Sequence, residues 1–110
     1  MSTTAHISYD QSIQIVDSGA FDQRRLELIH GDIREMSPIG PSHQNAIDYL
    51  MKWSVLKLDL DKVRVRIQGS IGLPECDSCP EPDVTWVTEK SYREERPQTK
   101  DVLLVIEVAR

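Results

Sequence analysis

Two acidic residues stand beside apolar runs in the C-terminal half of the chain. Asp83 precedes Val84-Thr85-Trp86-Val87, and Glu107 lies within the apolar run from Val102 to Val108. We expect both runs to be strands, so that an aspartate starting one strand can meet a glutamate near the end of the next. Two carboxylates on neighbouring buried strands repel unless a cation lies between them, and Mg²⁺ is the usual solution. This pair is the strongest functional signal in the sequence.

A third acid, Glu27, interrupts the apolar stretch Leu26-Glu27-Leu28-Ile29. A carboxylate in a buried strand is costly unless it is paired or bound to a metal. Each of the three acids alone is more often a structural carboxylate than a catalytic one, and the structural interpretation would pair it with Arg64, Arg66 or a backbone amide. Their combination is more specific and favours a metal site.

The elements that would position these acids follow from periodicity and turn residues. Residues 26–29 and 32–36 predict a β-hairpin, because Gly31 supplies the positive φ that a tight turn requires. Ser42 is typical of a helix N-cap, and apolar residues at three- and four-residue spacing then predict an amphipathic helix ending near Lys57 or Leu58. We expect its apolar stripe to face a sheet; the stripe contains Ala46, Ile47, Tyr49, Leu50, Trp53 and Leu56.

Further strands are predicted at 63–68, 83–87 and 101–108. Strict alternation of apolar and polar residues indicates the first. The continuous apolar character of 101–108 is typical of a central, doubly covered strand. Residues 70–73 allow a short strand, and 88–100 predict a loop with one helical turn near Glu89–Arg93. Residues 1–20 predict a loosely ordered arm, in which Ser12–Val16 allow a short strand. Residues 21–110 then form one domain of the α+β class, with a mixed sheet and a flanking helix.

Composition and charge limit the class of function. The chain has 110 residues, of which 28% are charged and 39% hydrophobic, as in a small globular domain. A net charge of −5 argues against binding nucleic acid by bulk attraction, although it does not exclude a nuclease, whose site concentrates carboxylates around metal. No apolar stretch reaches the roughly 18 residues of a membrane span, and no secretory signal is recognisable. A cytoplasmic protein with no membrane partner is therefore expected.

The two cysteines form one Cys76-x-x-Cys79 pair. Zinc needs about four ligands, and no second pair or nearby histidine is present in the sequence. A redox motif would start a helix, whereas Pro80-Glu81-Pro82 follows at once. We expect loop cysteines with no set role, and a zinc- or redox-dependent domain remains the weaker interpretation.

Several segments together resemble a known family. They are Leu26 to Ile33, Met36-Ser37-Pro38-Ile39-Gly40-Pro41-Ser42-His43, Val65 to Gln68, Pro80-Glu81-Pro82-Asp83-Val84 and Val102 to Val108. In this order and spacing the chain resembles the bacterial putative restriction endonuclease family called Uma-two, a member of the PD-(D/E)xK nuclease superfamily. The resemblance implies a restriction-endonuclease-like PD-(D/E)xK core that hydrolyses phosphodiester bonds of DNA with Mg²⁺, or with Mn²⁺ in its place.

The resemblance also implies roles for individual residues. Asp83 and Glu107 match the acids of the two half-motifs and would be catalytic metal ligands, and Glu27 would complete or support the metal shell. Gln68 would orient a ligand or the attacking water. His43 would lie near the site or bind the substrate. The partner would be nucleic acid, and a homodimer is allowed.

One part of the superfamily motif is absent from this sequence. The strict motif places a lysine two residues after Glu107, where this chain has Ala109, and the family's lysine is expected further on, beyond Arg110. We therefore expect the core to be incomplete at its C-terminus and its activity to be impaired. The alternative is a non-catalytic derivative of the fold that binds nucleic acid or another protein.

Overall fold

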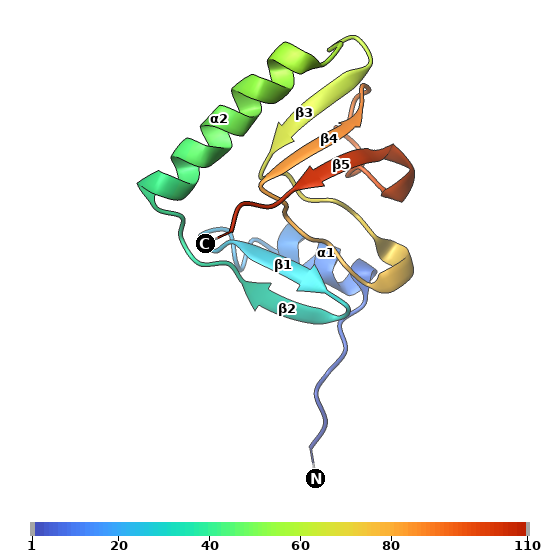
Figure 1. Ribbon diagram of the computed structural model, residues 1–110. Coiled ribbons are helices and arrows are strands. Elements are labelled where there is room, and N and C mark those ends of the chain that lie inside the picture. Colours follow the sequence, from blue (N-terminus) through green and yellow to red (C-terminus); the bar gives the residue numbers. More distant parts are fainter. Residues whose placement is uncertain (1, 110) are drawn as a thin grey trace. The chain divides into compact units, whose positions relative to one another are not determined.

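The computed structural model describes residues 2–109, which divide into two compact units. The hairpin unit comprises the residues up to 37 together with 72–80, and the sheet unit comprises 38–71 together with the residues from 81 onward. Within the described residues there are two α-helices and two antiparallel sheets, so the α+β class is confirmed (Figure 1). The single mixed sheet expected from the sequence is wrong, because both sheets are small and antiparallel.

The hairpin unit contains helix α1 (Tyr9–Asp17) and strands β1 (Leu26–Ile29) and β2 (Asp32–Glu35). The predicted hairpin is confirmed, and its two-residue turn places His30 and Gly31 at φ of 46° and 83°. Both central residues have positive φ, as in the turn that matches the twist of paired strands. Glycine at position 31 therefore removes most of the backbone strain of the turn.

Helix α1 replaces the short strand that the sequence allowed at Ser12–Val16. Its start is fixed by a capping box, in which Ser8 Oγ accepts from the Gln11 amide at 3.1 Å and Gln11 Oε1 accepts from the Ser8 amide at 2.9 Å. The pair satisfies two backbone donors that a helix start otherwise leaves without partners. Whether residues 1–20 are loosely ordered stays a prediction.

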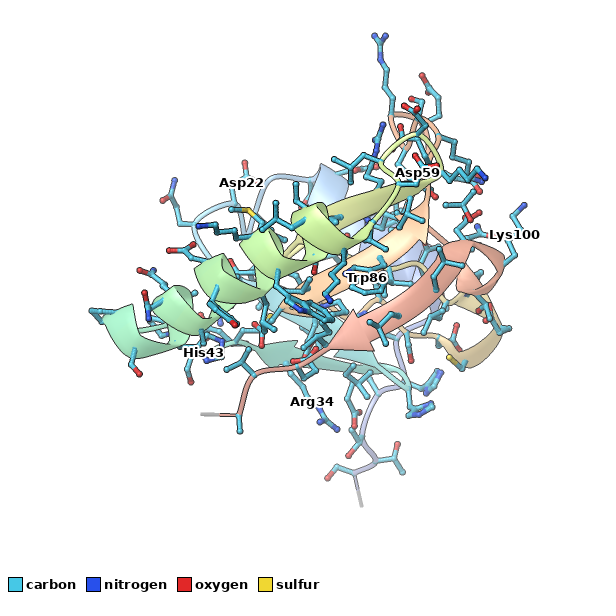
Figure 2. All side chains as sticks on the ribbon, turned by 45° about the horizontal axis from the view of Figure 1, so that its top comes forward. Asp22, Arg34, His43, Asp59, Trp86 and Lys100 are labelled. Atoms are coloured by element: carbon cyan, nitrogen blue, oxygen red, sulfur yellow. The ribbon has the colours of Figure 1, made fainter. Side chains whose placement is uncertain are left out.

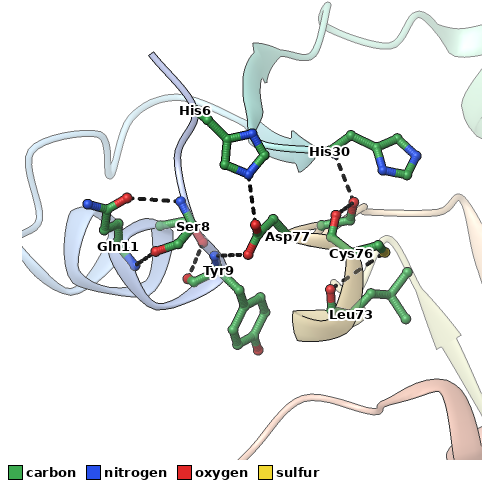
Figure 3. A network of polar contacts seen from close by, with 10 residues as sticks. His6, Ser8, Tyr9, Gln11, His30, Leu73, Cys76 and Asp77 are labelled. Carbon is green, nitrogen blue, oxygen red and sulfur yellow. Dashed lines mark hydrogen bonds and ion pairs between the residues drawn. The ribbon is translucent and has the colours of Figure 1, made fainter.

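A polar network joins the segment before α1 to the loop at Asp77 (Figure 3). Asp77 has a left-handed backbone, follows the short 3₁₀ turn Pro74–Cys76, and accepts from His6 Nε2 at 2.7 Å and from the Tyr9 amide at 2.9 Å. These contacts lower the pKa of the Asp77 carboxyl, with the His6 hydrogen bond as the main cause. The network thus ties two distant stretches of sequence into one unit.

The sheet unit contains helix α2 (Pro41–Lys57) and strands β3 (Val63–Ile67), β4 (Val84–Thr88) and β5 (Val102–Ile106). The strand order is β3-β4-β5, so β4 is central, and its Val84 and Val87 are fully buried. A second 3₁₀ turn (Thr99–Asp101) leads into β5, in place of the helical turn expected near residues 89–93. No strand forms at 70–73.

Helix α2 packs on β3 and β4, and Figure 1 shows it running alongside them. Gly40 is its N-cap and Pro41 its first residue, so the N-cap expected at Ser42 is wrong. Its predicted end at Lys57 is confirmed. The predicted stripe is only partly covered, because Tyr49 and Leu56 are 70% and 75% exposed.

Strand β5 differs most from expectation. It is an edge strand, and Leu103, Leu104 and Val105 are 57%, 38% and 43% exposed. The central, doubly covered position predicted for this run is therefore wrong for the residues described. A continuous apolar sequence does not by itself distinguish a covered strand from an uncovered one.

Candidate functional site

Asp83 is the buried centre of the candidate site. It directly precedes β4, and its side chain is 3% exposed. One carboxylate oxygen, Oδ1, lies 3.2 Å from His43 Nε2, and the other, Oδ2, accepts from the Val108 amide at 2.8 Å. The carboxylate therefore joins the start of α2 to the segment that follows β5.

His43 reaches Asp83 from the first turn of α2, and Figure 2 shows it at that end of the helix. Its side chain is 9% exposed. Because an ionised carboxylate only accepts hydrogen bonds, Nε2 is the donor in this contact. The second ring nitrogen, Nδ1, is buried and has no hydrogen-bond partner among residues 2–109.

Gln68 lies at the same end of the sheet, immediately after β3. Its backbone amide donates to the carbonyl of Asp83 at 3.0 Å, and its φ is 52°, a left-handed conformation that non-glycine residues seldom adopt. Its side-chain nitrogen, Nε2, is buried without a partner, as is Thr85 Oγ1 on β4. Buried polar atoms of this kind are rare in folded proteins, and together with His43 Nδ1 they leave hydrogen-bonding capacity around Asp83.

Glu107 directly follows β5 and is exposed. The pairing of Val84 with Ile106 sets this segment beside the start of β4, and the neighbouring Val108 amide binds Asp83. The expectation that Asp83 and Glu107 come from neighbouring strand ends is thus supported at the level of the backbone. A backbone donor such as the Val108 amide leaves no trace in the pattern of side-chain types, which is why sequence reasoning missed it.

Glu27 belongs to the hairpin unit. It lies on β1, half-buried, with Arg34 opposite it on β2. Its role in a metal shell stays a prediction.

The Asp83 carboxylate oxygens are of the type that hard cations such as Mg²⁺ prefer as ligands. No three histidine, cysteine, aspartate or glutamate side chains in residues 2–109 form a cluster that could hold a metal ion. Mg²⁺, however, usually keeps several waters and takes only one or two carboxylates from the protein. An ionised carboxylate has about four acceptor positions, so the two hydrogen bonds to Asp83 do not exhaust it. Asp83 therefore retains acceptor positions with which to bind such a cation.

The cysteines lie in the hairpin unit and form no disulfide. Cys76 Sγ lies 3.7 Å from the carbonyl of Leu73, and the Cys79 amide donates to the carbonyl of Leu28 at 2.7 Å. Both side chains are half-buried. The backbone contact of Cys79 gives it a packing role beside β1.

No helix within residues 2–109 combines the length and the apolar sequence that crossing a membrane requires. In a comparison with protein families, residues 11–110 match Uma2, putative restriction endonuclease. No curated protein and no solved structure matches the chain.

Proposed function

The chain belongs to the Uma2 family of putative restriction endonucleases, and from this premise we propose that it is a Mg²⁺-dependent endonuclease acting on DNA. The observation that carries the proposal is the environment of Asp83. A buried carboxylate is held by His43 and the Val108 amide where β3, β4 and β5 meet the first turn of α2. A side chain so costly to bury is typical of a site whose function requires its charge.

In this proposal Asp83 and Glu107 hold the metal. Mg²⁺ bound there would polarise the phosphate, activate water and stabilise the leaving oxygen. His43 donates from Nε2 to Asp83 Oδ1 and so fixes the orientation of the carboxylate. The buried side-chain amide of Gln68 has an unused donor with which to orient a water or a phosphate oxygen.

Ala109 stands two residues after Glu107, where the strict superfamily motif has a lysine. A lysine there would contribute a positive charge close to the attacking water and the phosphate. We propose that a chain with Ala109 at this position cleaves slowly unless a lysine elsewhere in the fold takes this role.

The decisive experiment measures nicking of supercoiled plasmid DNA with Mg²⁺. We expect slow cleavage by the wild type that disappears in EDTA and in Asp83→Ala, because the buried ligand is lost. Asp59→Ala is the matched control, since this exposed aspartate lies between α2 and β3 of the same unit and should leave cleavage unchanged. Cleavage that survives Asp83→Ala, or that needs no metal, would refute the proposed site.

The exposed apolar edge strand β5 favours a second candidate, a non-catalytic interaction module. Leu103 and Val105 lie on an open sheet edge, which is a ready template for pairing with another chain, including a second copy. Calorimetric titration with Mn²⁺ separates the two candidates. An enzyme site should show saturable binding that is lost in Asp83→Asn, whereas an interaction module should show none.

A further inference from the structure

Two arginines converge on one serine just beyond the end of β3. Arg66 Nη1 donates to the carbonyl of Ser70 at 3.0 Å, and Arg96 Nε donates to Ser70 Oγ at 2.8 Å. Both arginines are half-buried. Each guanidinium has five N–H donors, so these single contacts leave most of the donors unused.

Gly69 permits this arrangement. A Cβ added at Gly69 would lie 2.8 Å from Arg66 Cζ and 2.8 Å from its Nη2. The guanidinium therefore folds back over the backbone of the loop after β3, into space that a Cβ at position 69 would otherwise occupy. The sequence at 66–70 thus holds a long cationic side chain close to its own strand end.

The arginine pair lacks acidic partners within residues 2–109, and Arg66 also lies over the Tyr92 ring, with Cζ 5.7 Å from the ring centroid. Nearby cations have acidic partners: Arg64 pairs with Glu89 at 2.7 Å, and Lys90 pairs with Asp101 at 2.7 Å. Among the described residues, neither Arg66 nor Arg96 forms an ion pair. Burial is the main cause that lowers the pKa of the Arg66 guanidinium, and repulsion from Arg64 and Arg96 lowers it further, against an opposing effect of Tyr92.

The pair also lies close to the candidate site along the same strands. Arg66 stands opposite Thr85 in the β3–β4 register, and Thr85 is two residues from Asp83. Ser70 is two residues from Gln68, whose amide binds the Asp83 carbonyl. An anion held by the two arginines would therefore lie near Asp83 in the same unit.

We propose that Arg66 and Arg96 form a binding site for a backbone phosphate of DNA, next to the phosphodiester that the Asp83 site cleaves. The inference rests on the proposed function and assigns part of the substrate contact. Arginine matches the geometry of phosphate oxygens with paired donors. In a protein of net charge −5, DNA binding must depend on such local contacts.

The test is fluorescence anisotropy of a labelled 20-base-pair DNA duplex over a series of KCl concentrations, in EDTA so that cleavage is suppressed. Loss of one phosphate contact reduces the slope of log affinity against log salt by about 1. We expect this reduction in Arg66→Gln and in Arg96→Gln. Arg93→Gln is the matched control, because it removes the same charge from an exposed position in the same unit and should keep the wild-type slope.

Arg66→Lys is a control for loss of folding. Because it retains the charge at position 66, it should largely retain the salt slope of the wild type. The proposal is overturned when Arg66→Gln and Arg96→Gln keep the wild-type slope, or when Arg93→Gln changes it equally, which would indicate bulk charge alone. The outcome is independent of the nicking assay. If the two arginine variants keep the wild-type salt slope while Asp83→Ala abolishes cleavage, only the phosphate-site proposal is refuted. If the arginine variants reduce the slope while Asp83→Ala still cleaves, only the proposed metal site is refuted.

Discussion

The carboxylate of Asp83 connects two elements at once, because its two oxygens contact α2 through His43 and the chain after β5 through Val108. Such a residue has a structural role as well as a proposed catalytic one. The two roles separate experimentally, since the structural role changes stability and the catalytic role changes cleavage at equal stability. The partner His43 is the better residue with which to measure the structural part.

We predict that His43→Ala lowers the free energy of unfolding of the sheet unit by about 1–3 kcal/mol, because it leaves a buried carboxylate oxygen without its donor. Both tryptophans, Trp53 and Trp86, lie in this unit, so urea unfolding followed by their fluorescence reports on it. A double-mutant cycle with Asp83→Ala should give a coupling energy of about 0.5–3 kcal/mol. Additive single changes would show that the contact does not stabilise the fold.

At this scale the family resemblance implied that His43, Gln68 and Asp83 belong to one site. In the structure the His43 ring contacts the Asp83 carboxylate, and the Gln68 backbone amide donates to the Asp83 carbonyl. Glu107 was expected in a buried strand, yet it follows β5 and is exposed. Burial depends on which other segments cover a residue, and a local pattern of residue types does not contain that information.

At the scale of elements, the contact between α2 and β4 is organised around Trp86. Its indole stacks on Trp53 with ring centroids 5.8 Å apart, and Figure 2 shows Trp86 between the helix and the strands. Trp86 Nε1 donates to Ser54 Oγ at 2.9 Å, and Ser54 Oγ in turn donates to the Leu50 carbonyl at 2.7 Å. The stack combines apolar contact with a hydrogen bond from the part-buried indole N–H.

Ser54→Ala should therefore lower the free energy of unfolding by about 1–3 kcal/mol, because the part-buried indole N–H of Trp86 loses its acceptor, the hydroxyl of the fully buried Ser54. Urea unfolding by tryptophan fluorescence measures the change. Ser42→Ala on the first turn of the same helix is the control; this exposed serine should change stability by less than about 0.5 kcal/mol. Equal effects of the two changes would argue against the Trp86 contact.

Some elements were predictable from the sequence because local residue patterns determine them, and others were not. The β1–β2 hairpin and the end of α2 were predicted because glycine turns and helical periodicity act within a few residues. Helix α1 was missed, although the spacing of Ser8 and Gln11 is that of a capping box and could have revealed it. The sequence predicted that β4 and β5 are neighbours but not which strand is central, because β4 becomes central only by pairing with both β3 and β5.

Considered as a whole, the molecule depends on carboxylates whose charged form the fold stabilises. Hydrogen bonds to arginine side chains lower the pKa of Glu35, through Arg24, and of Glu89, through Arg64. In the sheet unit the pKa of Asp101 is lowered first by the backbone N–H of Gln98 and then by Lys90. Asp101 is 5% exposed, so solvent screens its contacts less than those of the two glutamates.

These shifts give stability a defined dependence on pH. A carboxyl whose pKa is lower in the folded state contributes stability above its unfolded pKa, which is 3.8 for Asp101, and loses it as pH falls through the folded value. In that range the unfolded chain binds more protons, so acid favours unfolding. We predict that the free energy of unfolding of the sheet unit is nearly constant above about pH 5 with respect to these groups and falls below about pH 4.

Asp101→Asn tests the contribution of this one residue, because the amide does not titrate. Urea unfolding by tryptophan fluorescence should show the variant less stable than the wild type at pH 7 and the difference narrowing by pH 3. Gln98→Ala keeps the backbone N–H that Asp101 accepts at 3.0 Å, so it should retain the wild-type pH dependence. If the free energies of unfolding of Asp101→Asn and the wild type differ by the same amount at pH 7 and pH 3, the contacts of Asp101 do not favour its charged form.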